Sequence, residues 1–425
     1  MATPYLTFVH TADLHLGSPF EGLGPVAPRI AEALREASFT ALERIVDLSL
    51  EEGADALLVA GDVYDSADRS LHAQRRFRDE LARAARGGVW SFVAHGNHDP
   101  LSGWQAPLEF PPEVHRFGPG VAVVGLEREG RVVAHVAGSS YPVRDVFETR
   151  VPDYARALAG FESPFLVALL HAHVGGDPNH AAYAPTSVPE LAAVTAVDYW
   201  ALGHVHGFRR VAGRPAVVYP GTPQGRSPRE GGPRGVALVR VATPHPRPED
   251  LEVTFVPTSG VDWERASCDV SAASFDDLFA ALERLRDEAR RADRGVVLTI
   301  VLCGRGGLHG ELTRLDFGRD LLLPLRAGED ERDDFVWVES IRDHTTPAAD
   351  LASARERDDL VGDFLRSASQ LREDPERIRE WLGRRCDSPR VLAELRSWPP
   401  ERLLGVLDAA LVLGHDLLTT PGDRG

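Results

Sequence analysis

Short apolar runs that each end in a cluster of polar residues recur through the first half of the chain, and each has the length of a buried strand. The runs occupy residues 5–9, 56–60, 89–94, 165–170 and 199–202. Apolar residues at helical spacing separate the first three runs, over 28–52 and over the arginine-rich stretch 71–86. Strands that alternate with helices predict an α/β core, in which ligands gather outside the carboxyl ends of the strands.

The pattern changes after residue 211. Short strands separated by Gly/Pro-rich turns are expected over 211–256, and the three prolines within 243–250 indicate a turn or a domain border. An amphipathic helix over 274–291 and a strand over 296–303 predict a small α/β domain.

The C-terminal stretch 349–420 has helical periodicity, and Pro389, Pro399 and Pro400 divide it into three expected helices. These helices either dock onto a partner or cap the same chain. The expected domains are therefore 1–258, 259–345 and 346–425.

Composition limits the classes of function. All 47 basic residues are arginine, because the sequence contains no lysine. This excludes a phosphate-binding loop of the G-x-x-x-x-G-K-[ST] type and a Schiff-base lysine, so another chain must supply any nucleotide hydrolysis. With 64 acidic residues the net charge is −17, which argues against a general basic surface that coats nucleic acid. Any contact with DNA must be local.

The sequence has no pattern typical of a membrane span or a signal peptide, and its cysteines form no recognisable motif. No apolar stretch approaches the roughly 18 residues that a membrane-spanning helix needs, and the start lacks a signal-peptide pattern, so a cytoplasmic protein without membrane contact is expected. Cys268, Cys303 and Cys386 are odd in number and far apart, which fits neither a disulfide framework nor a zinc site.

Five polar clusters follow the strands: HTADLHLG, VAGDVYD, HGNHDP, LLHAH and LGHVHG. Taken alone, Asp62 fits an ordinary turn aspartate and His171 a structural histidine. The three successive polar residues of HGNHDP are harder to explain by a turn. Together the clusters offer the candidate chemical groups Asp13, His15, Asp62, Asn97, His98, Asp99, His171, His204 and His206.

This set meets the needs of a two-metal site, which requires a bridging carboxylate and several terminal ligands. Imidazole, carboxylate and amide oxygen without thiolate suit manganese, iron or zinc better than calcium, and they disfavour a purely structural zinc site. Two divalent ions are the expected cofactors, with Mn²⁺, Fe²⁺ or Zn²⁺ as the candidates.

The motif order D-x-H, G-D, G-N-H-D, H, G-H-x-H resembles the calcineurin-like metallophosphoesterase superfamily. The wording HTADLHLG, GDVYD and YPGTPQGRS is similar to its DNA double-strand-break repair branch, the SbcD-like and YhaO-like exonucleases. The specific motifs cover residues 5–241, and the resemblance is looser beyond them. It implies a four-layered α/β/β/α sandwich with the metals at one edge, followed by a small α/β capping domain and a helical C-terminal segment.

The resemblance also implies roles for the site residues. One metal would be held by Asp13, His15 and His206, the other by Asn97, His171 and His204, and Asp62 would bridge them. His98 would face the scissile phosphate as general acid or transition-state stabiliser, with Asp99 orienting its other nitrogen, while a bridging hydroxide attacks phosphorus. His173 competes with His171 for its place, although His171 lies nearer the strand.

The sequence therefore predicts a metal-dependent DNA exonuclease in DNA repair, with endonuclease activity as a second option, that works beside an SbcC-like coiled-coil ATPase and can form a homodimer. The alternatives are a phosphodiesterase or phosphatase for a small phosphoester or cyclic nucleotide, and a noncatalytic scaffold. The candidate DNA contacts are Arg209, Arg210, Arg226 and Arg229, since arginine binds phosphate in a bidentate way. For any single arginine, ordinary surface coverage is the simpler explanation.

Overall fold

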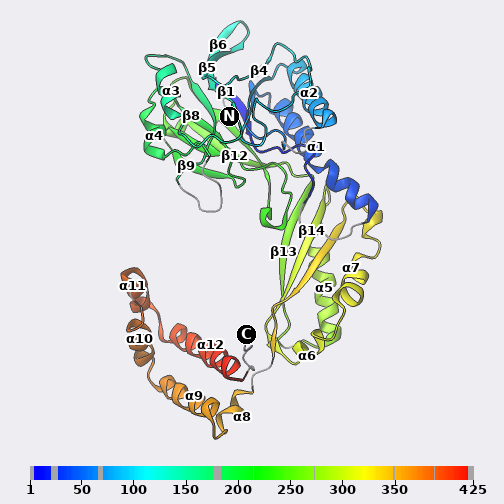
Figure 1. Cartoon of the computed structure of the whole chain (residues 1–425), viewed down its shortest axis with the longest axis vertical. Coiled ribbons are helices and arrows are strands. Elements are labelled where there is room, and N and C mark those ends of the chain that lie inside the picture. Colours follow the sequence, from blue (N-terminus) through cyan, green and yellow to red (C-terminus); the bar gives the residue numbers. More distant parts are fainter. Residues whose placement is uncertain are drawn as a thin grey trace. The chain divides into compact units, whose positions relative to one another are not determined.

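The computed structural model describes residues 4–20, 27–65, 70–175, 183–213, 215–271, 273–347, 350–386 and 388–419 (Figure 1). The chain forms two compact units. The first comprises Met1–Ala266, Leu282–Ile300 and Gly318–Ile341, and the second comprises Ser267–Ala281, Val301–Phe317 and Arg342–Gly425. The three-domain division expected from the sequence stays a prediction.

The first large sheet has the strand order β12-β11-β1-β2-β3-β4. Its strands are β1 (Leu6–Thr11), β2 (Ala56–Ala60), β3 (Trp90–Ala94), β4 (Val114–Arg116), β11 (Gly235–Val241) and β12 (Leu251–Pro257). β1, β2, β3 and β4 run parallel, and β11 pairs antiparallel with β1. β1 and β2 are buried along their whole length. The sequence of β2, ALLVA, is accordingly a continuous apolar run, whereas β1 also buries the polar residues Thr7, His10 and Thr11.

The second large sheet has the order β5-β6-β7-β8-β10-β9. Its strands are β5 (Ala122–Arg128), β6 (Arg131–Gly138), β7 (Leu166–His171), β8 (Tyr199–Gly203), β9 (Arg209–Gly213) and β10 (Ala216–Tyr219). β6, β7, β8 and β10 are parallel, so the carboxyl ends of β7 and β8 lie at the same edge.

The two sheets pack face to face, and helices cover their outer faces. Phe8 and Phe92 of the first sheet share one buried core with Phe165 and Tyr199 of the second. The helices α1 (Pro28–Glu51) and α2 (Leu71–Arg86) pack on the other face of the first sheet. Likewise α3 (Val151–Ala157) and α4 (Val188–Ala193) pack on the second. The predicted four-layered sandwich is confirmed.

A third sheet has the order β13-β14-β16, with β13 (Val261–Asp269), β14 (Gly295–Cys303) and β16 (Val336–Asp343). Around it in sequence lie α5 (Phe275–Ala289), β15 (Arg305–Gly306), α6 (Leu308–Leu312), α7 (Leu323–Arg326) and β17 (Thr346–Pro347). The helix and strand expected over 274–291 and 296–303 are thus present, with small shifts at their ends.

The C-terminal helices are α8 (Leu351–Arg355), α9 (Leu360–Ser369), α10 (Pro375–Gly383), α11 (Pro389–Ser397) and α12 (Pro400–Thr419). Pro389 and Pro400 begin helices as expected, because proline lacks only an N–H that the first helical turn leaves unused. Pro375 begins α10 in the same way. The expectation of three helices is therefore wrong. No described helix combines the length and hydrophobicity needed to cross a bilayer.

Candidate metal centre

The carboxyl ends of β2, β3, β7 and β8 meet around one imidazole ring, that of His171. Its Nδ1 donates to the carbonyl oxygen of Ala60, the last residue of β2, at 2.9 Å. Gly61, Gly96 and Gly203 surround this ring so closely that a Cβ on any of them would lie within 3 Å of His171 atoms. At Gly96 the Asp62 carboxylate, and at Gly203 the carbonyl oxygen of Ala60, would lie still closer to a Cβ than the ring does. A glycine thus precedes Asp62, Asn97 and His204 because His171 and these neighbours leave no room for a side chain.

Four of the candidate residues have strained backbone conformations, which set the directions of their side chains. The φ angles are +53° at Asp13, +44° at His15, +53° at Asp62 and +101° at His204. Non-glycine residues seldom adopt this region, and each instance costs of order 1 kcal/mol or more. Such strain persists where the surrounding structure enforces it, and it clusters at functional sites.

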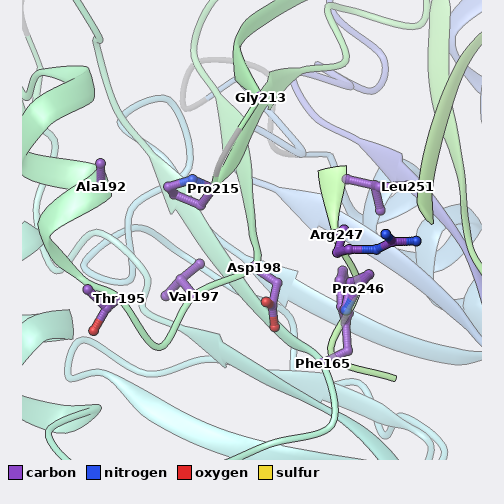
Figure 2. A pocket seen from close by; sticks show the side chains of 10 residues that line it. All are labelled: Phe165, Ala192, Thr195, Val197, Asp198, Gly213, Pro215, Pro246, Arg247 and Leu251. Atoms are coloured by element: carbon purple, nitrogen blue, oxygen red, sulfur yellow. The ribbon is translucent and has the colours of Figure 1, made fainter. Parts of the chain in front are cut away.

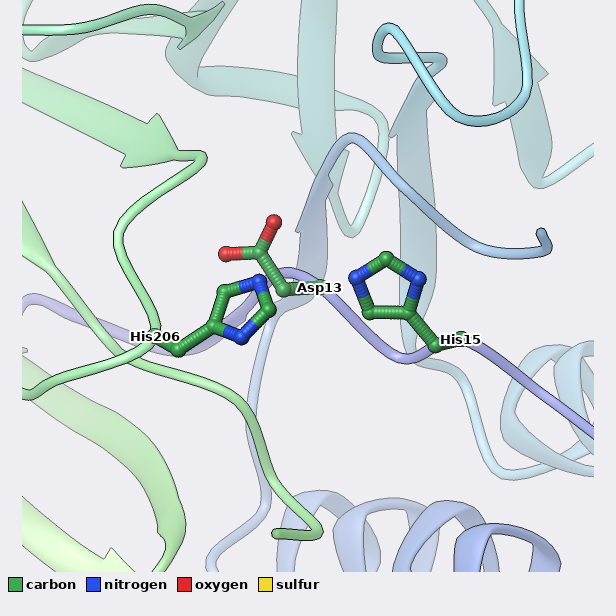
Figure 3. Close-up of side chains that lie close together, drawn as sticks. All are labelled: Asp13, His15 and His206. Atoms are coloured by element: carbon green, nitrogen blue, oxygen red, sulfur yellow. The ribbon is translucent and has the colours of Figure 1, made fainter. Parts of the chain in front are cut away.

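One group of candidate ligands consists of Asp13, His15 and His206 (Figure 3). Their ligand atoms all lie within 4.8 Å of one another. Asp13 and His15 come from the loop after β1, and His206 comes from the loop after β8.

His15 is the least satisfied ring of this group. It is fully buried, and neither of its nitrogens makes a hydrogen bond among the described residues, although an Asp65 carboxylate oxygen lies 3.3 Å from Nδ1. A buried polar atom without a hydrogen bond is costly. The ring therefore has the character of a metal ligand.

Glu230 orients the second imidazole of this group. His206 Nδ1 pairs with a Glu230 carboxylate oxygen, which leaves Nε2 to face the site. Burial lowers the pKa of His206, but the hydrogen bond to Glu230 and the charge of Asp13 raise it more, so the net pKa is raised. Burial raises the pKa of Glu230, but His206 lowers it more, to about 2. A carboxylate behind a histidine is the usual second partner of a metal-binding imidazole.

The structure has three such groups among the described residues, and the second consists of Asp13, Asp62 and His171, so it shares Asp13 with the first. The third consists of His15, Asp65 and His98 and shares His15 with the first. His171 Nε2 lies 3.0 Å from Asn97 Oδ1 and 3.3 Å from Asp62 Oδ2. Because Nδ1 donates to Ala60, a neutral ring would point a lone pair at two oxygen atoms. The position therefore requires either a proton or a cation, and ligand atoms around a single ion are themselves about 3 Å apart.

His204 lies beside these residues. Its backbone N–H donates to both carboxylate oxygens of Asp13, at 3.1 and 3.0 Å. Its ring stands edge-on to that of His171, with centroids 5.3 Å apart, and lies 5.9 Å from the ring of His173. His173 is also buried, and its Nδ1 has no hydrogen-bond partner among the described residues.

The electrostatics of the buried carboxylates depend on the histidines. Burial would raise the pKa of Asp62, but His171, His15 and His98 hold it well below its usual range. Burial lowers the pKa of His171, but Asp62 and Asp13 raise it more, to about 9. Without a metal, His171 therefore carries a proton on both ring nitrogens at neutral pH and is positively charged.

The predicted pairing of Asp99 with His98 is wrong. The Asp99 carboxylate accepts from His95 Nδ1 at 2.7 Å and from the backbone N–H groups of Gly96 and Val63. It shapes the loop that presents Asn97 and does not touch the His98 ring. His95, to which the sequence assigned no role, is its buried partner.

Asp65 is the residue that orients His98. Its carboxylate pairs with His98 Nδ1 and also accepts from Arg226 at 2.9 Å and from Ser18 at 2.6 Å. This hydrogen bond raises the pKa of His98. The sequence contained a sign of this role for Asp65, since Asp65 is the last residue of the GDVYD motif. No sequence motif marked Glu230 as the partner of His206, because it lies 24 positions away, at the end of a short 3-10 helix.

The four predicted DNA-contact arginines separate in the structure. Arg226 reaches the site through Asp65. Arg209 and Arg210 are exposed on β9, and Arg229 is exposed in the loop that carries Glu230. The structure thus places one of them at the cluster itself.

A cavity of about 270 Å³ lies at the opposite ends of the second sheet's strands (Figure 2). Its lining includes Phe165, Asp198 and Pro215, which directly precede β7, β8 and β10. Asp198 accepts from the backbone N–H of Leu166 at 2.8 Å, so its carboxylate fixes a strand end. This cavity is not part of the metal centre.

The sequence comparisons agree with the geometry. Residues 6–208 match the model of the calcineurin-like phosphoesterases, and residues 263–346 match the middle domain of metallophosphoesterase YhaO. The chain is 34% identical over 354 residues to the uncharacterized metallophosphoesterase YhaO of Bacillus subtilis (strain 168), covering 82% of this chain and 84% of that protein. The chain belongs to the calcineurin-like phosphoesterase family. The family uses divalent metals, and the Asp/His groups described above are able to bind them.

Two further relatives are similar at lower identity. The DNA double-strand break repair protein Mre11 of Aeropyrum pernix is 27% identical over 234 residues, covering 50% of this chain and 52% of that protein. A nuclease SbcCD component of Bacillus subtilis (strain 168) is 27% identical over 259 residues, covering 53% of this chain and 64% of that protein. The chain thus spans about half of one and less than two thirds of the other.

Metal affinity should rise with pH. A proton on His171 competes with a cation below the pKa of about 9, so affinity is lost as pH falls. We expect the Mn²⁺ association constant, measured by calorimetry, to rise by up to about tenfold per unit between pH 6 and 8, with proton release. An affinity independent of pH, without proton release, would contradict the protonation of His171.

Gly96→Ala should weaken metal binding by at least about tenfold, the scale of losing a supporting contact. Its new Cβ would lie 2.3 Å from Asp62 Oδ1 and 2.9 Å from His171 ring atoms. The matched control is Gly118→Ala, where a Cβ meets nothing within 4 Å. Equal affinities of the two variants would show that ring packing does not shape the site.

Proposed function

We propose that this protein is a metal-dependent DNA exonuclease, with endonuclease activity as a second mode. The observation that carries the proposal is the convergence of two ligand groups beside a histidine that can donate a proton. The names of two relatives, a DNA double-strand break repair protein and a component of a nuclease, support DNA as the substrate. The proposed ligands are Asp13, His15 and His206 for one ion, and Asn97, His171 and His204 for the other, with Asp62 bridging.

When bound, two divalent ions, with Mn²⁺ preferred over Fe²⁺ or Zn²⁺, would supply Lewis-acid activation of water and of the phosphate. The protein contributes the arrangement. Fixed side chains hold the scissile phosphate in place without reorganising during the reaction. His171 and His206 are held by Ala60 and Glu230 on their far sides, so their near nitrogens stay aimed at the site.

His98 would donate a proton to the departing sugar oxygen. Its side chain is 37% exposed and its Nδ1 is engaged by Asp65, so Nε2 is the nitrogen available to a substrate. The Asp65 hydrogen bond raises the pKa of His98, which keeps more of the protonated form near neutral pH. Asp65 is a positioning residue, because it acts through His98.

Arginines near the cluster would bind the DNA backbone. Arg226 and His98 pair with the two oxygens of the same Asp65 carboxylate, so Arg226 would contact the phosphate next to the one that is cut. Arg209, Arg210 and Arg229 are exposed and would follow the strand further along. A net charge of −17 means that this contact is local.

We further propose an SbcC-like coiled-coil ATPase as partner; homodimer formation stays a prediction from the sequence. The support is the similarity to a component of the nuclease SbcCD and the absence of lysine, which removes the chain's own phosphate-binding loop. The helices after residue 346 are the proposed partner-binding segment.

His98→Ala should lower hydrolysis of linear DNA with Mn²⁺ by about 10²- to 10⁴-fold, since it removes the general acid. The exposed His72 on α2 provides the control His72→Ala, which should retain full activity. Wild-type protein that cleaves simple phosphodiesters or cyclic nucleotides but not DNA would replace the nuclease proposal with a small-substrate phosphodiesterase.

Asp65→Asn should shift the pH–rate profile on DNA. The Asp65 carboxylate raises the pKa of His98, so its removal lowers that pKa, and the donor loses its proton at a lower pH. We expect the alkaline limb of kcat, measured at saturating metal, to move to lower pH. An unmoved limb would show that His98 is not the group that titrates.

A further inference from the structure

Two aromatic rings stack beside the metal centre, at the edge of the hydrophobic core: Tyr183 packs against the core, and Phe147 lies outside it. The rings of Phe147 and Tyr183 have centroids 5.5 Å apart and planes 16° from parallel. Phe147 is 64% exposed, whereas the core phenylalanine Phe8 is 1% exposed. Burial therefore gives Phe147 little stabilisation, and folding does not explain its position.

Backbone hydrogen bonds hold this aromatic pair against the candidate ligands. Ala184 N donates to Val146 O at 2.7 Å, which fixes the segments carrying the two rings next to each other. His173 N donates to Tyr183 O at 3.0 Å. The Tyr183 ring also stands edge-on to His204, with centroids 5.9 Å apart and planes at 86°. The outermost ring, Phe147, thus rests on Tyr183, which rests on a proposed metal ligand.

A flat, exposed ring in this place suits the face of a nucleobase. Proteins that bind single strands combine local positive charge with aromatic rings on which bases stack, and every base offers a π-face. This chain has a net charge of −17, so charge alone gives it little affinity for DNA. Stacking is the attractive contact that a negatively charged protein can still offer.

We infer that Phe147, supported by Tyr183, stacks on an unpaired nucleobase near the scissile phosphate, so that the preferred substrate is a DNA end whose terminal bases are unpaired. This inference rests on the proposed nuclease function. It adds a base contact to a site otherwise built to recognise only the sugar-phosphate backbone. A base that is stacked in this way would hold the strand in register with His98.

The test is a cycle of enzyme and substrate changes. Wild type and Phe147→Ala are compared on single-stranded oligonucleotides that carry either normal bases or one abasic site at each of the first three positions from either end. Stacking of one base on a ring accounts for a factor of about five or more. We expect each change alone to lower kcat/KM by at least about fivefold at one position, and both together to lower it no further.

Two further variants test whether the loss comes from the aromatic ring at position 147. Phe147→Trp keeps an aromatic face and should retain wild-type preference for the normal base. Phe275→Ala removes a phenylalanine that is 41% exposed at the start of α5, in the other compact unit, and should leave every rate unchanged. Thermal midpoints of Phe147→Ala and Phe275→Ala within a degree or two of wild type would show that both fold, as expected for exposed positions.

The outcomes separate this inference from the proposed function. If wild type cleaves DNA and Phe147→Ala cleaves it equally well, or if the losses from the abasic site and from Phe147→Ala multiply, the stacking inference is overturned alone. If wild type cleaves no DNA under any metal condition, the nuclease proposal fails and the inference falls with it.

Discussion

The imidazole of His171 is the point around which the site is assembled, because three segments at the strand ends can approach it only where they carry glycine. Gly61, Gly96 and Gly203 pack against its ring, and each directly precedes a candidate ligand. Its hydrogen bond to Ala60 joins an end of the second sheet to an end of the first. Packing that leaves no space for a methyl group fixes the loops to within tenths of an ångström, which is the precision that metal coordination requires.

Such precision has a cost in stability. Asp13, His15, Asp62 and His204 hold positive φ angles, and Asp13 and Asp62 lie fully buried near each other. Two buried carboxylates repel unless positive charge lies between them. Protonated histidines can supply part of that charge, but divalent cations supply more. A cation would also bind one of the two His15 nitrogens, neither of which makes a hydrogen bond to the described residues. The strain and the repulsion are thus explained together by a site built for cations.

Much of this arrangement could be predicted from the sequence, since parallel buried strands are continuous apolar runs and their carboxyl ends converge. That the seven expected ligands bind metal stays a prediction. The partner of His98 was assigned wrongly, because Asp99 is its neighbour in the sequence whereas Asp65 lies 33 positions away in another motif. Only the loop geometry shows that Asp99 turns toward His95. Glu230 was missed because long-range folding, and no local pattern, brings it to His206. Phe147 had no motif around it, and only folding brings it against Tyr183.

The central claim is that seven side chains hold a pair of cations. Anomalous X-ray scattering from crystals grown with Mn²⁺ tests it directly, since the ions themselves are located. The account predicts two peaks about 3.5–4 Å apart, both within bonding distance of Asp62. One would lie beside Asp13, His15 and His206, and the other beside Asn97, His171 and His204. A single peak elsewhere on the surface, or none near His171 at saturating Mn²⁺, would contradict it.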